Sequence, residues 1–277
     1  MEQVAVIDLG SNSIRFIIIE ITQNGAHKLV YQEKESIRLS AGMLENNMCL
    51  TEEAQQRALK LLSVYAHIIE SQHIHTVLAV ATAAVRNARN GASFIKRVRA
   101  KTGIPMTVIS GYAEATLGFS GVIHTIDEKD FLLFDLGGAS IEISLVKNKK
   151  RVKSISIPIG AVTLTQKFDS SDEISSSQRK EIEEFISSQL HRISWLPKSG
   201  LPVIGIGGTV RNLAKMHQRK TGYPLPKLHN YRLPVKELFK MIDYLSRTSA
   251  HERENISGLS EERTDIIIAG SLVIEQL

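Results

Sequence analysis

The pattern of apolar and polar positions predicts buried strands alternating with amphipathic helices. Residues 4–7 (VAVI) and 131–134 (FLLF) are continuous apolar runs, which suit strands buried on both faces. Thr51 is a good N-cap for a helix, because two glutamates follow it and apolar residues then recur at helical spacing as far as residue 69. The alternation predicts an α/β fold with a mixed sheet.

The same pattern continues through the rest of the chain. Further strands are predicted at residues 75–84, 106–110, 141–147 and 151–157. Further helices are predicted at residues 91–102, 112–125, 161–168, 176–192, 235–246 and in the last stretch, 259–277. Residues 201–218 are typical of a strand, a glycine-rich turn and a helix, and residues 221–234 form a proline-containing loop.

One short pattern occurs twice. Residues 8–16 read DLGSNSIRF and residues 135–143 read DLGGASIEI, each between two apolar runs. The small residues allow unusual backbone angles or close approach of a ligand. An aspartate that ends a buried strand is costly unless it is paired or bound to a metal ion. The repeat suggests a duplication whose two halves grip one ligand.

The linking segment SGVIHTIDEKD places a domain boundary between residues 124 and 125. We therefore predict two domains, residues 1–124 and 125–277, which agrees with a chain of 277 residues. The two similar turns and the GIGGT turn at 205–209 are expected to converge on a crevice between the domains, where α/β proteins favour their ligand sites.

Composition narrows the functional class. Hydrophobic content of 43% and charged content of 23% are ordinary for a globular protein, and the sequence has no 18-residue apolar stretch, so we expect no membrane span. The single cysteine and the absence of an export signal favour the cytoplasm. A net charge of +5 favours an anionic partner, but no nucleic-acid-binding motif is present.

The three turns offer the chemistry of a phosphate site. Backbone N–H groups in such turns can hold phosphate oxygens, and a helix that begins at Thr209 adds its dipole. Asp8, Asp135 and Glu142 supply the hard oxygen ligands that Mg²⁺ prefers. The GxxxxGK[ST] phosphate loop is absent, and GIGGTV lacks the third glycine of a dinucleotide-binding turn.

Six ordered motifs carry a resemblance to a known family: DLGSNSIRF, ATAAVRNARN, VISGYAEATLGFSGV, FDLGGASIEI, GIGGTVRNL and GLSEERTDIIIAG. Together they resemble the exopolyphosphatase and guanosine pentaphosphate phosphohydrolase (Ppx/GppA) family, in its short two-domain form. The resemblance implies two ribonuclease-H-like domains of the actin, sugar kinase and Hsp70 superfamily around an interdomain cleft. It also implies Mg²⁺ or Mn²⁺ and hydrolysis of a phosphoanhydride bond in inorganic polyphosphate or pppGpp.

The resemblance assigns roles to single residues. Glu114 matches the second glutamate of the family's SGxEEA motif and is expected to activate water, whereas Ala113 replaces the first. Arg86 is expected to hold phosphate or to orient Glu114. Asp8, Asp135 and Glu142 are the expected metal ligands. The expected phosphate-binding residues are Gly10, Ser11, Asn12, Ser13, Gly137, Gly138, Ala139, Ser140, Gly207, Gly208 and Thr209.

Several alternatives stay open at this stage. Ala113, Ala139 and the lack of a DGxxREG-like segment after residue 277 leave room for a sensor that binds (p)ppGpp or polyphosphate without turnover. An ATP-binding kinase or ATPase of the same superfamily is the other alternative. Polyphosphate and guanosine penta- or tetraphosphate both remain candidate partners, and a homodimer is compatible with the family. Arg263 either faces the cleft or forms an ion pair with Glu261 or Glu262.

Two groups of basic residues complete the list of candidates. Lys215, Arg219, Lys220 and Lys227 are candidates for a track along which a polyanion leaves the cleft. The segment KNKKRVK at 147–153 is interpreted as the solvated tip of a hairpin.

Overall fold

A computed structural model describes residues 2–196 and 200–277. Internal packing divides the chain into two compact units, Met1–Gly111 and Tyr112–Leu277, and each is described by itself. The division lies after the first residue of helix α4 (Gly111–Ile123), whereas the sequence placed a domain boundary between residues 124 and 125. The reason is the packing of Val122 and its neighbours on α4, which contact apolar residues of the second sheet.

The first unit is built on a five-stranded mixed sheet. In spatial order its strands are β3 (His27–Ser36), β2 (Ser13–Ile21), β1 (Glu2–Leu9), β4 (Thr76–Ala81) and β5 (Met106–Val108). Strand β2 is antiparallel to both of its neighbours, whereas β1, β4 and β5 run parallel to one another. The central strand β1 therefore ends at the same edge of the sheet as β4.

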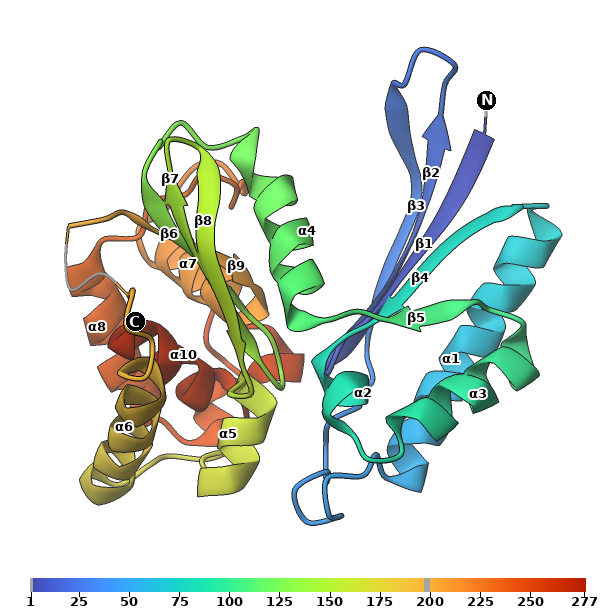
Figure 1. The fold of residues 1–277 in the computed structure, drawn as a ribbon. Helices are drawn as coiled ribbons and strands as arrows, with labels where there is room; N and C mark the ends of the chain where they lie inside the picture. Colours follow the sequence, from blue (N-terminus) through green and yellow to red (C-terminus); the bar gives the residue numbers. More distant parts are fainter. Residues whose placement is uncertain (1, 197–199) are drawn as a thin grey trace. The chain divides into compact units, whose positions relative to one another are not determined.

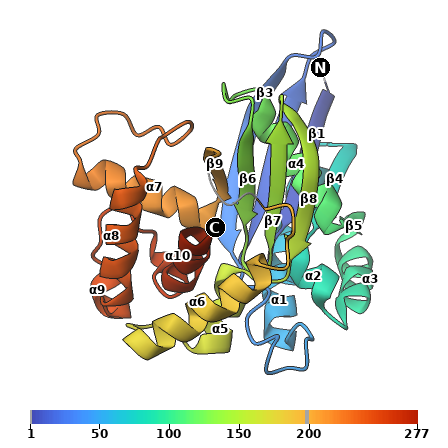
Figure 2. The same cartoon turned by 60° about the vertical axis from the view of Figure 1, so that its left-hand side comes forward.

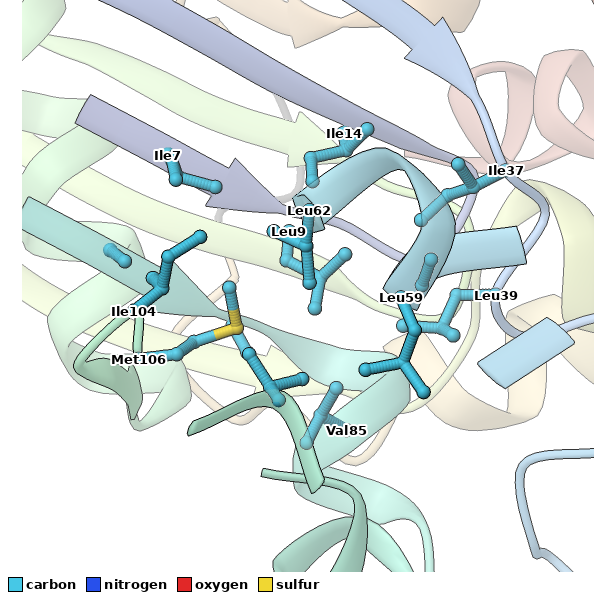
Figure 3. Packing of buried hydrophobic residues seen from close by; sticks show 14 of the residues in the cluster. Ile7, Leu9, Ile14, Ile37, Leu39, Leu59, Leu62, Val85, Ile104 and Met106 are labelled. Atoms are coloured by element: carbon cyan, nitrogen blue, oxygen red, sulfur yellow. The ribbon is translucent and has the colours of Figure 1, made fainter. Parts of the chain in front are cut away.

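Helices α1 (Glu52–Ser71) and α3 (Gly91–Thr102) cover one face of this sheet (Figure 1). The hydroxyl of Thr51 accepts a hydrogen bond from the N–H of Ala54, as expected of an N-cap. The core between sheet and helices contains alternate residues of β1, such as Ile7 and Leu9, together with Leu59 and Leu62 of α1 (Figure 3). Alternate burial along β1 turns Asp8 to the opposite face.

The second unit repeats this topology. The strands of its four-stranded sheet are, in spatial order, β8 (Lys150–Ile157), β7 (Ile141–Lys147), β6 (Phe131–Leu136) and β9 (Val203–Gly207). Strand β7 is antiparallel to β6 and β8, and β9 is parallel to β6. The predicted relation between the two hairpins is confirmed, because β1–β2 and β6–β7 occupy the same places in their sheets.

Helices cover both faces of the second sheet (Figures 1 and 2). Helix α4 packs on the face that carries Phe131, Leu133 and Val146. The other face packs against the remaining helices, which are α5 (Ala161–Phe168), α6 (Ser176–Leu190), α7 (Gly208–Lys220), α8 (Val235–Ser246) and α10 (Ile267–Gln276). Two short helical segments, α9 (Ala250–Arg253) and η1 (Glu261–Arg263), precede α10.

The predicted fold class is confirmed. Each unit has three antiparallel strands followed by parallel strands on the other side of the first strand, which is the ribonuclease-H-like arrangement of the actin, sugar kinase and Hsp70 superfamily. Most predicted elements lie where the pattern placed them, with two differences. Strand β4 ends at Ala81 and α2 (Ala83–Asn87) follows, so the prediction of a strand as far as residue 84 was wrong. The C-terminal helix α10 begins at Ile267, later than predicted.

None of the described helices combines the length and the apolar character that crossing a membrane requires.

Candidate active site

The two similar turns have the same backbone arrangement in their separate units. The N–H of Gly10 donates to the carbonyl of Ser13 at 3.0 Å, and the N–H of Gly137 donates to the carbonyl of Ser140 at 2.9 Å. Within residues 2–196 and 200–277, the N–H groups of residues 11, 12, 138 and 139 have no hydrogen-bond acceptor. Unpaired amides in a tight turn favour an anion. That both turns bind phosphate through their backbone stays a prediction.

The serine hydroxyls of these turns have partners inside the fold. The Ser11 hydroxyl accepts a hydrogen bond from the N–H of Ala84 at 3.1 Å and so caps α2. The Ser140 hydroxyl donates to Oε1 of Glu142 at 2.9 Å. Its proton is therefore not available to a phosphate oxygen while that bond is present. That Ser11 and Ser140 bind phosphate stays a prediction, and of the two only the Ser11 hydroxyl keeps a proton that it can donate.

Two other predicted phosphate ligands have enclosed side chains. The amide of Asn12 and the hydroxyl of Thr209 are buried without a hydrogen-bond partner in the described parts of the chain. Thr209 lies against α10, because a methyl group on Gly270 would be 2.7 Å from its Oγ1. Thr209 can therefore reach a ligand through its backbone N–H in the first turn of α7, but not through this hydroxyl. Ala139, in the second turn, is also buried.

The second unit brings acidic side chains together on the face that α4 covers. Asp135 of β6 and Glu142 of β7 are direct neighbours in the antiparallel register. Glu142 is buried, and the hydroxyl of Ser156 on β8 also donates to its Oε1, at 2.6 Å. Burial and then the charge of Glu114 on α4 raise the pKa of Glu142 to about 7, Asp135 adds to the increase, and the two serine hydroxyls oppose it. Glu114, Asp135 and Glu142 thus form one electrostatic cluster, which we call the carboxylate cluster.

The glycine-rich turn before α7 lies beside this cluster. Gly207 has a φ of +103°, and a methyl group there would be 2.5 Å from the carbonyl oxygen of Leu136 and 3.1 Å from Oδ1 of Asp135. Glycine is required here both by the backbone angle and by the close contact. No side chain caps α7 at this residue. The N-terminus of α7 therefore presents its dipole next to Asp135.

Arg263 lies at the same turn, and it was left without a definite role by the sequence. A methyl group on Gly208 would be 1.9 Å from Nη2 of Arg263, so the guanidinium lies directly against the backbone at the start of α7. Arg263 is buried. The second unit thus places a positive side chain, a helix N-terminus and three carboxylates around one short segment of backbone.

The first unit contributes a different set of groups. Asp8 of β1 is the direct neighbour of Arg15 on β2. The Asp8 side chain has solvent-accessible surface, but the protein around the carboxylate removes part of its hydration. This loss of hydration raises the pKa of Asp8, and the charge of Arg15 opposes the increase. Nη1 of Arg86, on α2, donates to the carbonyl of Ile109 at 3.0 Å. This contact holds the segment that leads into α4, and the role of Arg86 in orienting Glu114 stays a prediction.

The carboxylate cluster has the donor chemistry of a Mg²⁺ or Mn²⁺ site. Among the described residues, no group of three or more acidic, histidine or cysteine side chains is arranged to hold a metal ion by itself. Mg²⁺ commonly uses one or two carboxylates and takes its other ligands from water and substrate phosphate. Asp135 and Glu142 fit that pattern, and a cation would offset the repulsion that raises the pKa of Glu142.

The predicted basic residues fall into two groups. Lys215 and Arg219 lie on the exposed side of α7 together with Arg211, each four residues from the next, and none of the three has an ion-pair partner in the described residues. By contrast, Lys220 pairs with Glu237 at 3.1 Å. Lys227 lies exposed in the following loop.

Sequence reasoning missed two residues of this region. Ser156 was not singled out, although the alternation in SISI on β8 is a signal that one serine faces the same side as Glu142. Arg151 was interpreted as part of a solvated hairpin tip, but its guanidinium contacts α4.

Comparisons with known proteins agree with these motifs. The model of the Ppx/GppA phosphatase family matches residues 17–277. A bifunctional 3-dehydroquinate synthase/phosphatase of Fusobacterium nucleatum is 31% identical over 286 residues, which cover 99% of this chain and 42% of that protein. The chain thus spans less than half the length of that relative. Exopolyphosphatase 2 of Mycobacterium tuberculosis is 29% identical over 292 residues, which cover 100% of this chain and 90% of that protein.

Solved structures give the same result. An exopolyphosphatase from Cytophaga hutchinsonii matches with a TM-score of 0.88 and 27% identity, covering 99% of this chain and 89% of that one. The Aquifex aeolicus member of the Ppx/GppA family matches with a TM-score of 0.77 and 26% identity, again covering 99% and 89%. With a family model that matches nearly the whole sequence, the chain belongs to the Ppx/GppA phosphatase family.

Proposed function

We propose that this chain hydrolyses the terminal phosphoanhydride bond of inorganic polyphosphate, and that the 5′-phosphate of pppGpp is a second substrate of the same chemistry. The observation that carries the proposal is the carboxylate cluster beside the glycine-rich N-terminus of α7. The names of the similar exopolyphosphatases support the choice of substrate.

The backbone of the second unit supplies the binding half of the reaction. The unpaired N–H groups at residues 138 and 139 and the N-terminus of α7 are donors for phosphate oxygens. Arg263 adds a positive charge at Gly208. Phosphoryl transfer depends mainly on positioning and on neutralising charge on the phosphate oxygens, so a site built from such donors suits it.

Glu114 is the residue that we assign to the water molecule. As a carboxylate it can accept a proton from water and orient that water for in-line attack on the terminal phosphorus. Its charge is close enough to Glu142 to raise the pKa of that residue, so Glu114 lies on the side of α4 that borders the cluster. Arg86 supports the chain just before α4 through Ile109.

Asp135 and Glu142 would hold Mg²⁺ or Mn²⁺. A divalent cation supplies charge neutralisation of the phosphate oxygens when it is bound. The serine hydroxyls of residues 140 and 156 hold the carboxylate of Glu142 in a fixed orientation. This arrangement leaves Asp135 facing Gly207 and the start of α7.

Phosphate release from the purified chain tests the proposal. Long-chain polyphosphate, pppGpp and ATP are offered with and without Mg²⁺, to the wild type and to Glu114→Gln. Glu181→Gln is the matched control, because Glu181 is an exposed glutamate on α6 of the same unit. We expect Mg²⁺-dependent release by the wild type and the control, and a loss of about 100-fold or more in Glu114→Gln.

Other outcomes point elsewhere. Binding of polyphosphate or pppGpp without phosphate release would replace the hydrolase with a non-catalytic sensor. Release from ATP alone would favour an ATPase of the same superfamily. Unchanged turnover in Glu114→Gln, with release retained by the wild type, would remove Glu114 from its assigned role.

A further inference from the structure

An irregularity in the β7–β8 hairpin changes the direction of one side chain. In the register of this hairpin, Lys153 lies opposite Leu145, and Arg151 lies opposite Val146. Val152 is therefore an extra residue on β8, which makes a β-bulge. Residues three apart in a regular strand point to opposite faces, but the extra residue brings Arg151 and Ser154 to the same face. Their contact shows this, because Nη1 of Arg151 donates to Oγ of Ser154 at 2.8 Å.

The face to which Arg151 turns is the one covered by α4. Nη2 of Arg151 donates to Oγ1 of Thr116 at 2.6 Å, and its guanidinium carbon lies 4.3 Å from the centre of the Tyr112 ring. Tyr112 and Thr116 are one turn apart, and the Thr116 hydroxyl donates to the Tyr112 carbonyl at 2.7 Å. One guanidinium thus holds both ends of a single helical turn through a charged hydrogen bond and a cation–π contact.

Glu114 is the middle residue of that turn. At about 100° per residue, Tyr112 and Thr116 share one flank of the helix, and Glu114 points to the opposite flank. The residues between these flanks, Ala115 and Val122, are buried toward the sheet. Arg151 therefore restrains rotation of α4 about its axis. A rotation of about 10° would move a group about 6 Å from the axis by about 1 Å, an error that can cost on the order of 100-fold in rate.

The composition of α4 makes such a restraint useful. Its sequence, GYAEATLGFSGVI, has glycines at residues 111, 118 and 121. Each of the two interior glycines, at residues 118 and 121, weakens a helix by roughly 1 kcal/mol relative to alanine. The glycine at 118 allows close approach to the sheet, because a methyl group there would be 3.1 Å from Ile206. Close packing at one glycine and weak intrinsic helicity leave the first turns dependent on outside contacts.

We propose that Arg151 is a positioning residue, which fixes the rotation of α4 and thereby places Glu114 beside Asp135 and Glu142. The inference rests on the proposed function of Glu114. It assigns Arg151 a role in turnover and not in holding substrate, although the residue lies in a basic hairpin of the kind that binds polyanions.

Four variants separate these roles. Arg151→Met removes the guanidinium group and its charge. Thr116→Val removes the hydroxyl that accepts its hydrogen bond, and Tyr112→Leu removes the aromatic ring beneath it. Each is expected to lower kcat for polyphosphate about 10- to 100-fold while KM changes less than about threefold. Tyr112→Phe, which keeps the ring, should retain activity. Two of these residues carry no charge, so a shared effect on kcat cannot come from lost attraction for the substrate.

Lys153→Met is the matched control, because Lys153 is an exposed cation on the same strand with no ion-pair partner in the described residues. If Arg151 instead binds polyphosphate, Arg151→Met will raise KM, Lys153→Met will do so in part, and Thr116→Val will do nothing. That result would overturn the proposal, as would an unchanged kcat in Arg151→Met.

Amide hydrogen exchange in residues 111–117 gives a readout that does not depend on activity. Exchange should be faster than in the wild type in Arg151→Met and in Thr116→Val. The double variant should exchange no faster than either single variant, and Lys153→Met should exchange like the wild type. If the wild type hydrolyses none of the substrates, the proposed function fails, and exchange still decides whether Arg151 restrains α4. Equal exchange in wild type and Arg151→Met would refute the restraint.

Discussion

Replacing Glu142 with Gln is expected to stabilise the metal-free protein above pH 7. Burial and the neighbouring charges raise the pKa of Glu142 from 4.5 to about 7 in the folded state. A carboxyl with a raised folded-state pKa binds its proton more tightly in the folded than in the unfolded chain. Its contribution to stability is therefore fully present below pH 4.5 and is lost as the pH rises through 7. A Gln at this position carries no charge, and its carbonyl can still accept from Ser140 and Ser156.

The magnitude follows from the size of the shift. The pKa rises by about 2.5 pH units, and each unit corresponds to about 1.4 kcal/mol, so the free energy of unfolding should fall by about 3 kcal/mol between pH 4.5 and pH 8. Because Glu114 and Asp135 act on the same proton, this free energy belongs to the carboxylate cluster as a whole. The difference in free energy of unfolding between wild type and Glu142→Gln should therefore lack this contribution at low pH. The contribution should be largest at pH 8.

Urea unfolding in EDTA at pH 5, 6, 7 and 8 measures that difference. The single tryptophan, Trp195, packs against the core of the second unit, so its fluorescence reports the unit that contains Glu142. Glu181→Gln is the control and should follow the wild type at every pH. Adding Mg²⁺ at pH 8 should stabilise the wild type and have less effect on Glu142→Gln. A difference between wild type and Glu142→Gln that stays constant from pH 5 to pH 8 would refute the reasoning.

Gly208→Ala should displace the Arg263 guanidinium, which is the movable end of a long side chain, and lower phosphate release about 10-fold or more with a small change in Tm. Gly121→Ala, at an exposed helix position with open space, should leave activity unchanged and stabilise by up to about 1 kcal/mol. Lys215→Glu combined with Arg219→Glu should raise KM for long polyphosphate more than for short chains, and less so at high salt; equal effects on both lengths would exclude an extended track.

Local patterns predicted the parts of the site that depend on neighbouring residues along the chain. The strand, turn and strand around Asp135 place Glu142 directly opposite it, because a short hairpin fixes the register. The glycine-rich turn before α7 was equally visible, since only glycine tolerates the backbone at residue 207.

The remainder depends on contacts between distant segments. Helix α2 begins within an apolar run that resembles a strand, and its first turn is capped by Ser11, 73 residues away. The direction of Arg151 depends on a bulge, and a one-residue change in register reverses every side chain beyond it. Periodicity within one strand carries no record of such an insertion, so the sequence interpretation left Arg151 in solvent.

The two similar turns have diverged in charge and not in backbone arrangement. Arg15 in the first hairpin and Glu142 in the second occupy equivalent positions, each opposite the aspartate that ends the preceding strand. Arg15 therefore offsets part of the Asp8 charge within the chain, whereas Asp135 faces a second carboxylate. Like charges directly opposite one another in a sheet are destabilising unless something compensates them. A cation at the second hairpin would supply that compensation, as does the proton that Glu142 holds below pH 7, whereas Arg15 supplies part of it at the first hairpin.

The comparison of Asp8→Asn with Asp135→Asn tests that division. Mn²⁺ binding, measured by calorimetry in the absence of substrate, should weaken at least about 10-fold in Asp135→Asn, because one of two adjacent carboxylates is lost. Asp8→Asn should change the affinity less than about threefold, since Arg15 already compensates that carboxylate. Equal losses in the two variants would show that Asp8 is a metal ligand of the same rank, and would mean that the Arg15 charge does not determine which hairpin holds the cation.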